Sequence, residues 1–261
     1  MRFLRTMIAA AVLAAPLVTL TVPPTAWAAA DDSSKDDAQI LKDAQGKLKN
    51  KKFSGVQVAV QNGMVTLTGS VPLYADKQDA QKNVGKVKNV VSVVNDIQVQ
   101  AGESTDQQLA DKIGKQLAYD RVGYGNAFNA ITASVQNGVV TMGGHALGPV
   151  AKDSALNIAK RTPGVTNVID KIEVDPVSPM DDRIRQQVAR RVYGYPSLNK
   201  YAINPANPIR ITVINGHVIL SGVVDNQSDK DVAGIQANTV PGVFSVTNNL
   251  QVAGQPEEKR Q

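Results

Sequence analysis

The chain has 261 residues, of which 43% are hydrophobic and 20% are charged. This is the composition of a soluble protein with packed cores, and the length exceeds that of one small domain, so two or three domains are expected. The formal net charge of +5 is compatible with an anionic partner without demanding one. Because the chain has no cysteine, disulfide bonds and a lipid-modified N-terminal cysteine are excluded.

The first 28 residues have the layout of a secretory signal peptide. Arg2 and Arg5 precede an apolar run from Met7 to Leu20, and the small-residue segment Ala26-Trp27-Ala28 ends it. An uncleaved membrane anchor is the alternative. No other stretch approaches the roughly 20 apolar residues of a transmembrane helix. Export to the periplasm is therefore predicted, as a protein that is not a lipoprotein and has no transmembrane segment after cleavage. Its net charge would be +3, from 26 basic and 23 acidic residues.

The first structured unit follows a small, polar and flexible leader, residues 29–35. Asp37 precedes apolar residues at four-residue steps, which predicts a helix capped by Asp37. Apolar and polar residues then alternate over 56–71 on both sides of Asn62-Gly63, which predicts a β-hairpin with a tight turn. A helical pattern over 74–88 and a β-branched run over 90–99 complete a helix-strand-strand-helix-strand order.

The same unit occurs three times. Its hairpin turn recurs at Asn137-Gly138 and Asn215-Gly216, at spacings of 75 and 78 residues. Asp106 and Asp181 begin the corresponding first helices at shifts of 69 and 75, so all length variation lies between the first helix and the first strand. The same shifts of 75 and 78 align a strand glycine, most simply explained by close approach of a helix or by a bend. These glycines are Gly69, Gly144 and Gly222.

The repeats predict an α+β protein of three tandem αββαβ two-layer domains. Each domain is expected to have a three-stranded mixed sheet with two helices on one face. Short linkers of about five residues span less than about 20 Å, so neighbouring copies should lie close together. The predicted segments are domain 1 at 36–100 (copy 1), domain 2 at 105–175 (copy 2), domain 3 at 180–252 (copy 3), and a disordered tail at 253–261.

The extra residues of copies 2 and 3 form two tyrosine-containing loops, 120–129 and 194–208. Variation on a constant scaffold is where a binding difference between copies is expected. The alternative is that these loops fold back and that their aromatic side chains cap the local core.

The repeated pattern resembles the BON domain family. The residues that carry the resemblance are V-x-V-x-N-G-x-V-x-L-x-G-x-V at 58–71, Pro163-Gly164-Val165 and Pro241-Gly242-Val243 at a fixed distance, and V-x-N-x-L-x-V at 246–252. Copy 1 departs from the pattern with Asn89 where the other copies have Gly164 and Gly242. Copy 2 departs from it with Met142 at the Leu position and Ala146 in place of the final Val. The resemblance covers nearly the whole mature chain. It implies binding to phospholipid membranes or to envelope partners under osmotic or related stress, without a catalytic activity.

No constellation of residues indicates catalysis or a cofactor. The two histidines, His145 and His217, lie at non-equivalent positions without ligand spacing, so a metal site is not predicted and solvent-facing strand histidines are favoured. The pairs Asp36-Asp37 and Asp181-Asp182 lie at helix starts, where carboxylates stabilise the helix dipole by about 0.3–1 kcal/mol each. A nucleic-acid partner is disfavoured by export and the low excess of positive charge. We therefore expect a protein that is not an enzyme.

Basic and aromatic side chains are the candidate binding groups. Copies 1 and 3 carry net charges of +3 and +2, whereas copy 2 is neutral. Solvated helix faces are the plain interpretation, and contact with anionic phospholipid headgroups is the functional one. The alternative function is a protein-interaction or chaperone-like module that uses exposed sheet edges and the tyrosine loops. The candidate residues are Lys47, Lys49, Lys51, Lys52, Lys82, Lys86, Arg190, Arg191, Tyr193, Tyr195, Lys200, Tyr201 and Tyr124.

Overall fold

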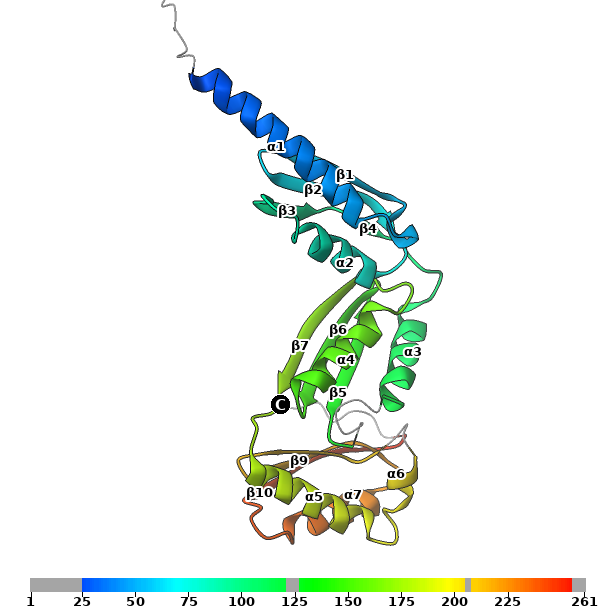
Figure 1. Cartoon of the computed structure of the whole chain (residues 1–261). Helices are drawn as coiled ribbons and strands as arrows, with labels where there is room; N and C mark the ends of the chain where they lie inside the picture. Colours follow the sequence, from blue (N-terminus) through cyan, green and yellow to red (C-terminus); the bar gives the residue numbers. More distant parts are fainter. Residues whose placement is uncertain (1–24, 121–126, 205–207, 255–261) are drawn as a thin grey trace, which may run out of the picture.

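Three similar α+β modules follow one another along the chain (Figure 1). The computed structural model describes residues 25–120, 127–204 and 208–254, with side chains described from residue 36 onward. In each module two helices pack on one face of a mixed sheet, as the sequence predicts. The segment 1–24, the loop centre around Tyr124 and the tail from residue 255 lie outside the described residues. No helix in the described part is long and apolar enough to cross a membrane.

Copy 1 begins with a helix that extends well beyond its sheet (Figure 1). The last strand of this copy is split into two pieces, both parallel to the second strand, with the fully buried Ile97 between them. The elements are α1 (Thr25–Lys47), the short 3-10 helix η1 (Lys51–Phe53), β1 (Val56–Gln61), β2 (Met64–Val71), α2 (Tyr74–Val84), β3 (Ser92–Asn95) and β4 (Gln98–Val99).

Copies 2 and 3 repeat this order with an uninterrupted last strand. Copy 2 consists of α3 (Asp106–Ala118), β5 (Ala130–Gln136), β6 (Val139–Ala146), α4 (Pro149–Lys160) and β7 (Asn167–Val174). Copy 3 consists of α5 (Pro179–Tyr193), the short α6 (Lys200–Ile203), β8 (Arg210–Ile214), β9 (His217–Val224), α7 (Gln227–Asn238) and β10 (Ser245–Val252).

The middle strand of each sheet is antiparallel to the first strand and parallel to the last. In copy 2, for example, Val140 of β6 pairs with Val135 of β5 and with Val168 of β7. The inward side chains of the middle strand form the floor of the core: Val65 and Leu67 are fully buried, as are Val140 and Met142 in copy 2. The helix that connects the middle strand to the parallel last strand supplies the crossover that parallel pairing requires.

An aspartate of each first helix binds the hairpin turn. Its two carboxylate oxygens accept the backbone N–H groups of the Asn-Gly pair: Asp37 binds Asn62 and Gly63 at 2.7 and 2.8 Å. Asp106 binds its turn at 2.6 and 2.9 Å, and Asp181 at 2.9 and 2.8 Å.

The predicted cap at Asp37 and the predicted leader are therefore corrected. Helix α1 begins at Thr25, so residues 29–35 are helical and Asp37 lies inside the helix. In the other two copies the caps are Thr105 and Ser178, whose side chains accept from Gln108 N–H and Asp181 N–H. A carboxylate early in a helix has two acceptor oxygens to offer, and here both are used by the turn rather than by the helix end.

The strand glycines are required by backbone shape and by a neighbouring strand, not by a helix. Gly69 and Gly144 have φ angles of +100° and +89° and are not buried. A Cβ on Gly69 would lie 2.0 Å from the carbonyl oxygen of Gly55, and one on Gly144 would lie 2.0 Å from that of Ala130. Gly222 has the same constraint, with φ +131°. The predicted close approach of a helix is not the cause, because the atoms nearest to a Cβ at these positions belong to the backbone at the start of the first strand.

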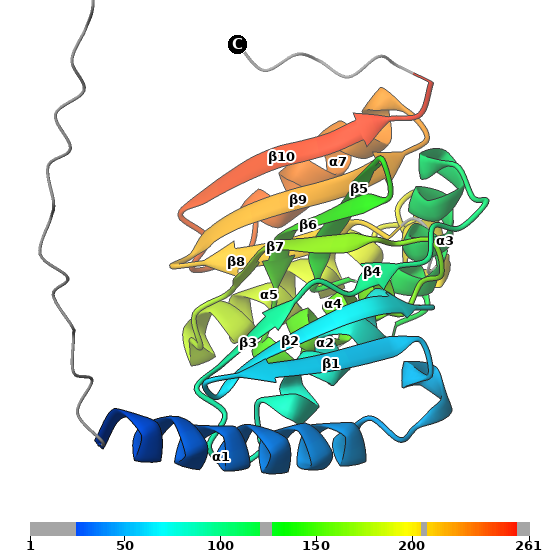
Figure 2. The same ribbon diagram turned by 90° about the horizontal axis from the view of Figure 1, so that it is seen from above.

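Copies 2 and 3 are joined by more than their linker. The backbone N–H of Ile211 in β8 donates to the carbonyl of Ala127 at 2.8 Å, and Phe128 packs against the core of copy 3. Asp175, at the end of copy 2, is buried between His145 (3.2 Å) and Arg185 of α5 (3.6 Å). Burial raises the pKa of Asp175, although the charges of His145 and Arg185 oppose this. Seen from above, the sheets of the three copies lie one after another (Figure 2).

Candidate functional site

An open groove of about 880 Å³ lies in copy 1 between the end of α1 and the segment that follows α2. Lys42, Lys47 and Lys49 contribute from one side, and Lys86 and Lys88 from the other. Asp43 is the single carboxylate among the lining residues, and Val87 supplies an apolar side chain. Five ammonium groups and one carboxylate give the groove a net charge of +4.

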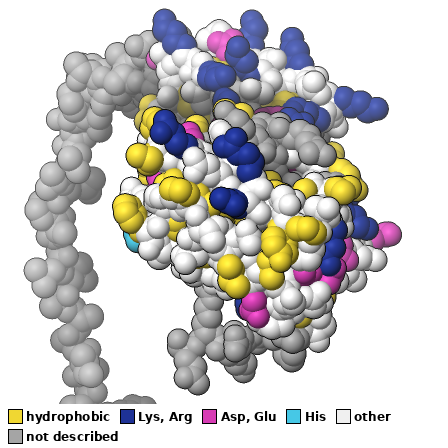
Figure 3. Space-filling model, turned by 90° about the horizontal axis from the view of Figure 1, so that it is seen from below, with side chains coloured by type: hydrophobic (Ala, Val, Ile, Leu, Met, Phe, Trp, Pro, Cys, Tyr) yellow, Lys and Arg dark blue, Asp and Glu magenta, His cyan; other side chains and the backbone are white. Residues whose placement is uncertain are grey.

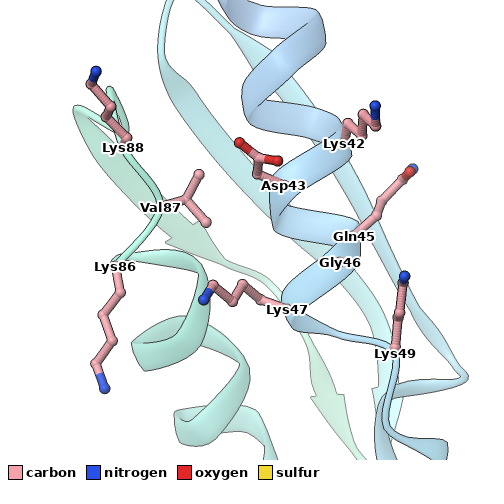
Figure 4. A pocket seen from close by; sticks show the side chains of 9 residues that line it. All are labelled: Lys42, Asp43, Gln45, Gly46, Lys47, Lys49, Lys86, Val87 and Lys88. Carbon is pink, nitrogen blue, oxygen red and sulfur yellow. The ribbon is translucent and has the colours of Figure 1, made fainter.

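The lysine side chains of the groove extend in different directions (Figure 4). In Figure 4, Lys47 extends across the gap toward the end of α2, and Lys86 and Lys88 point outward from the segment after α2. All five lysines are exposed, and none has a carboxylate within salt-bridge distance among the described residues. Asp43 accepts a hydrogen bond from the Gln39 side chain at 2.9 Å. Lys47 also lies in the last turn of α1, where positive charge is favourable.

The other two copies lack this basic groove. At the repeat positions of Lys47 and Val87, copy 2 has Gln116 and Thr162, whose side chains hydrogen-bond each other at 3.4 Å. The repeat position of Lys42 is Asp111 in copy 2. Copy 2 keeps one basic residue of the set, Arg161 at the position of Lys86, and copy 3 keeps one, Arg191 at the position of Lys47. The groove is therefore a property of copy 1 and not of the repeat.

The lysines predicted for copy 1 do not form one surface. Lys47, Lys49 and Lys86 line the groove, whereas Lys51 and Lys82 are exposed elsewhere. Lys52 is engaged inside the copy: its ammonium group lies 2.6 Å from Asp79 and 3.1 Å from Asp76. The hydrogen bond with Asp79 raises the pKa of Lys52, against the opposing effect of burial.

Two members of the predicted basic-aromatic surface of copy 3 take part in a network within that copy. Tyr201 is 4% exposed; its hydroxyl donates to Asp229 at 2.7 Å and accepts from the Asp225 N–H at 2.8 Å. Lys200 lies 2.6 Å from Asp225 and 2.8 Å from Asp229. The hydrogen bond to Asp225, and after it the one to Asp229, raises the pKa of Lys200. Tyr201 and Lys200 are therefore occupied, and the loop folds back onto its own core.

The remaining aromatic and basic candidates of copy 3, at the end of α5 and just after it, differ in exposure. Tyr193 is half-buried, and its hydroxyl donates to the carbonyl of Ile209 at 2.5 Å. Burial raises the pKa of Tyr193. Tyr195 is 38% exposed, and Arg190 and Arg191 are exposed in the last turn of α5. In the space-filling view from below, Lys and Arg gather most densely along the upper edge, and hydrophobic side chains are spread over the rest (Figure 3).

The two histidines have ordinary partners. His145 is half-buried and contacts Asp175, whereas the sequence predicts a solvent-facing side chain. His217 is exposed; its Nδ1 lies 2.7 Å from the Ser245 hydroxyl, and its ring lies 6.0 Å from that of Phe244. In the described part of the chain no three His, Asp or Glu side chains are placed to hold a metal ion.

Signals for part of this arrangement exist in the sequence. Lys42 and Lys88 complete the groove but are absent from the predicted site. Lys42 lies five residues before Lys47 on one helix, and Lys88 lies two residues after Lys86, so both could have been included by proximity. What the sequence does not show is which lysines line the same groove.

Comparisons with known proteins agree with the repeat. The family model described as "BON domain" matches residues 36–101, 105–176 and 181–254. The "Osmotically-inducible protein Y" of Escherichia coli (strain K12) is 27% identical over 212 residues, which cover 77% of this chain and 96% of that protein. An "Uncharacterized protein in gshII 5'region" of Anaplasma centrale is 30% identical over 144 residues, covering 53% of this chain and 95% of that protein.

Solved structures give a weaker likeness. The C-terminal domain of CdsD, a structural protein of the type III secretion system of Chlamydia trachomatis, is 16% identical with a TM-score of 0.24. That alignment covers 82% of this chain and 96% of the CdsD chain.

Proposed function

The chain belongs to the BON domain family, and from that premise we propose that it is an exported, non-enzymatic protein that binds the cell envelope under osmotic or related stress. The name of its Escherichia coli relative supports the link to osmotic stress. The proposed location is the periplasm, after cleavage of residues 1–28. The proposed modules are 36–100, 105–175 and 180–252, followed by the tail 253–261.

The proposed binding surface is the copy 1 groove, and its proposed ligand is an anionic phospholipid surface. The observation that carries this proposal is the set of five exposed lysines without internal carboxylate partners among the described residues. Each Lys or Arg close to an anionic bilayer contributes about 1 kcal/mol. Asp43 is the one acidic residue that lines the groove in the described part of the chain, so the described carboxylates cancel little of the attraction.

Vesicle co-sedimentation with a charge-matched pair of variants tests the proposal. One variant changes Lys47, Lys49 and Lys86 to Gln, and the control changes three exposed lysines of copy 2 to Gln. At low salt the groove variant should bind vesicles of anionic phospholipid about 100-fold more weakly, because three contributions of about 1 kcal/mol are lost. The control variant should lose much less, although its net charge is the same. The control residues are Lys112, Lys115 and Lys171.

Two results would contradict the proposal. Equal losses in both variants would show that total charge matters and the groove does not. Equal binding of the unmodified protein to anionic and neutral vesicles would remove phospholipid charge as the determinant. Raising the salt concentration should weaken vesicle binding of the unmodified protein, as the loss of the groove lysines does, since exposed charges are screened.

A protein-interaction or chaperone-like role is the second candidate, and the sheet edges favour it. β7 and β10 each have eight residues and pair with one strand alone among the described residues. An unpaired strand edge can accept an extended segment of another protein. This function would suppress aggregation of a client protein, and the effect would survive reversal of the groove charges. Loss of the effect on charge reversal would argue against the sheet edges.

A further inference from the structure

All Asn-Gly pairs in this chain lie in the three hairpin turns. The sequence contains three such pairs, Asn62-Gly63, Asn137-Gly138 and Asn215-Gly216, and each is held by the aspartate of the first helix of its copy. The three asparagines are exposed and have φ angles of +51°, +52° and +51°. The chain therefore places its most deamidation-prone dipeptide at one structural position and repeats it there.

Deamidation at this dipeptide requires the glycine nitrogen. The backbone nitrogen of the glycine loses its proton and attacks the Cγ atom of the asparagine side chain. A bond forms between that nitrogen and Cγ, the bond from Cγ to Nδ2 breaks, and ammonia leaves. Water then opens the resulting succinimide at either carbonyl, which gives aspartate or isoaspartate. The sum is one amide and one water converted to one carboxylate and one ammonium ion.

The structure engages the attacking nitrogen in a hydrogen bond. The N–H of each turn glycine donates to an aspartate oxygen, at 2.8 Å for Gly63 and Gly216 and 2.9 Å for Gly138. A proton that is shared with a carboxylate is harder to remove than one shared with water.

The other side of each glycine is held as well. Its carbonyl accepts a backbone N–H from the segment before the last strand, as Gly63 does from Val91 at 2.9 Å and Gly216 from Phe244 at 2.9 Å. Turning the glycine nitrogen toward the asparagine side chain would break both interactions.

We propose that Asp37, Asp106 and Asp181 protect the three Asn-Gly turns from deamidation, in addition to joining helix to hairpin. The protection matters because the product would damage the same contact. A carboxylate at position 62 would lie in the turn that is bound by the carboxylate of Asp37. Isoaspartate would add a backbone atom to a turn whose length sets the register of the whole hairpin.

Peptide mapping by mass spectrometry tests the proposal, because the three turns serve as controls for one another. In the Asp106→Ala variant, conversion of Asn137 during incubation at neutral pH should be at least about tenfold faster than in the unmodified protein, a factor that corresponds to about 1.4 kcal/mol. Conversion of Asn62 and Asn215 should not change. Asp111→Ala is the matched control, since Asp111 is exposed on the same helix and accepts a hydrogen bond from Gln107.

Three outcomes would overturn the proposal. The first is an unchanged rate at Asn137 in the Asp106→Ala variant. The second is equal acceleration of all three sites by that variant. The third needs no variant: deamidation of the unmodified, folded chain as fast as that of the same chain in denaturant. If copy 2 of the alanine variant unfolds, Asp106→Asn keeps one acceptor oxygen, and it should give a rate between those of the unmodified and the denatured chain.

Discussion

Replacing Tyr201 by Phe should destabilise copy 3 well beyond the loss of one hydroxyl group at a surface. That hydroxyl is buried, donates to the carboxylate of Asp229 and accepts from the Asp225 N–H. A hydrogen bond to a charged group contributes about 1.5–3 kcal/mol and a neutral one about 1 kcal/mol, so the change should lower the free energy of unfolding of copy 3 by about 3 kcal/mol. Tyr193→Phe is the matched control, because that hydroxyl makes one neutral bond to the Ile209 carbonyl.

Hydrogen-deuterium exchange measured by mass spectrometry separates the copies within the intact chain. Peptides from β8 and β9 should lose protection about 100-fold in the Tyr201→Phe variant and about fivefold in the Tyr193→Phe variant. Peptides from β1 and β2 should not change and serve as the internal reference. Equal effects of the two variants would refute the reasoning, since they would show that the bond to Asp229 contributes nothing beyond a neutral bond.

The pH dependence of the same variant gives a second test. Burial would raise the pKa of Asp229, but hydrogen bonds from Lys200 and Tyr201 outweigh it and lower that pKa below its ordinary value of 3.8. Asp229 therefore stabilises the folded state above pH 3.8, and this contribution is lost as the pH falls through the lowered pKa. Thermal denaturation of the Tyr201→Phe variant should show a smaller loss of stability on acidification than the unmodified protein.

Gly144→Ala should destabilise copy 2 by about 2 kcal/mol or more, because the residue has a positive φ and its new Cβ would clash with the Ala130 carbonyl. Gly114→Ala on α3, where a Cβ meets no neighbour, should stabilise copy 2 by about 0.5–1 kcal/mol. Thermal melts that shift in the same direction would contradict this. Burial would raise the pKa of Asp170, but Lys152 outweighs it and lowers that pKa, so the stability of copy 2 should fall as the pH drops below 3.8. In the Lys152→Gln variant, melting temperatures measured across this pH range should fall less. Phe128→Ala should weaken the packing of copies 2 and 3 by about 2 kcal/mol, seen as severalfold faster proteolysis at residues 175–179; an unchanged rate would argue against this role.

The sequence predicts the repeat unit well because its pattern is local. Alternating valines around Asn62-Gly63 and the fixed spacing of the glycines determine strand pairing, and the structure confirms the α+β modules. The role of Asp37 escaped prediction because a carboxylate near a helix start resembles a cap. Its true partner lies 25 residues away along the chain. Contacts across that distance leave no periodic trace.

The candidate site is harder to predict for the same reason. Charge composition points to copy 1, where the groove lies, yet it does not separate Lys52, which is paired inside the copy, from Lys47, which is not. The tyrosines of copy 3 are an instructive case, because a polar aromatic residue in an extra loop suits an interface and a core equally. Tyr201 finds a buried carboxylate, and that partner decides the question.

The backbone hydrogen bond from Ile211 to Ala127 has a consequence for how such repeats can be recombined. The unit that duplicates in the sequence is one copy, but copies 2 and 3 share a strand contact and an aromatic side chain across their boundary. A chain cut between them would leave Phe128 without its packing surface and the Ile211 N–H without its acceptor, the Ala127 carbonyl. Shuffling or deleting single copies should therefore succeed for copy 1 and fail for either of the other two alone.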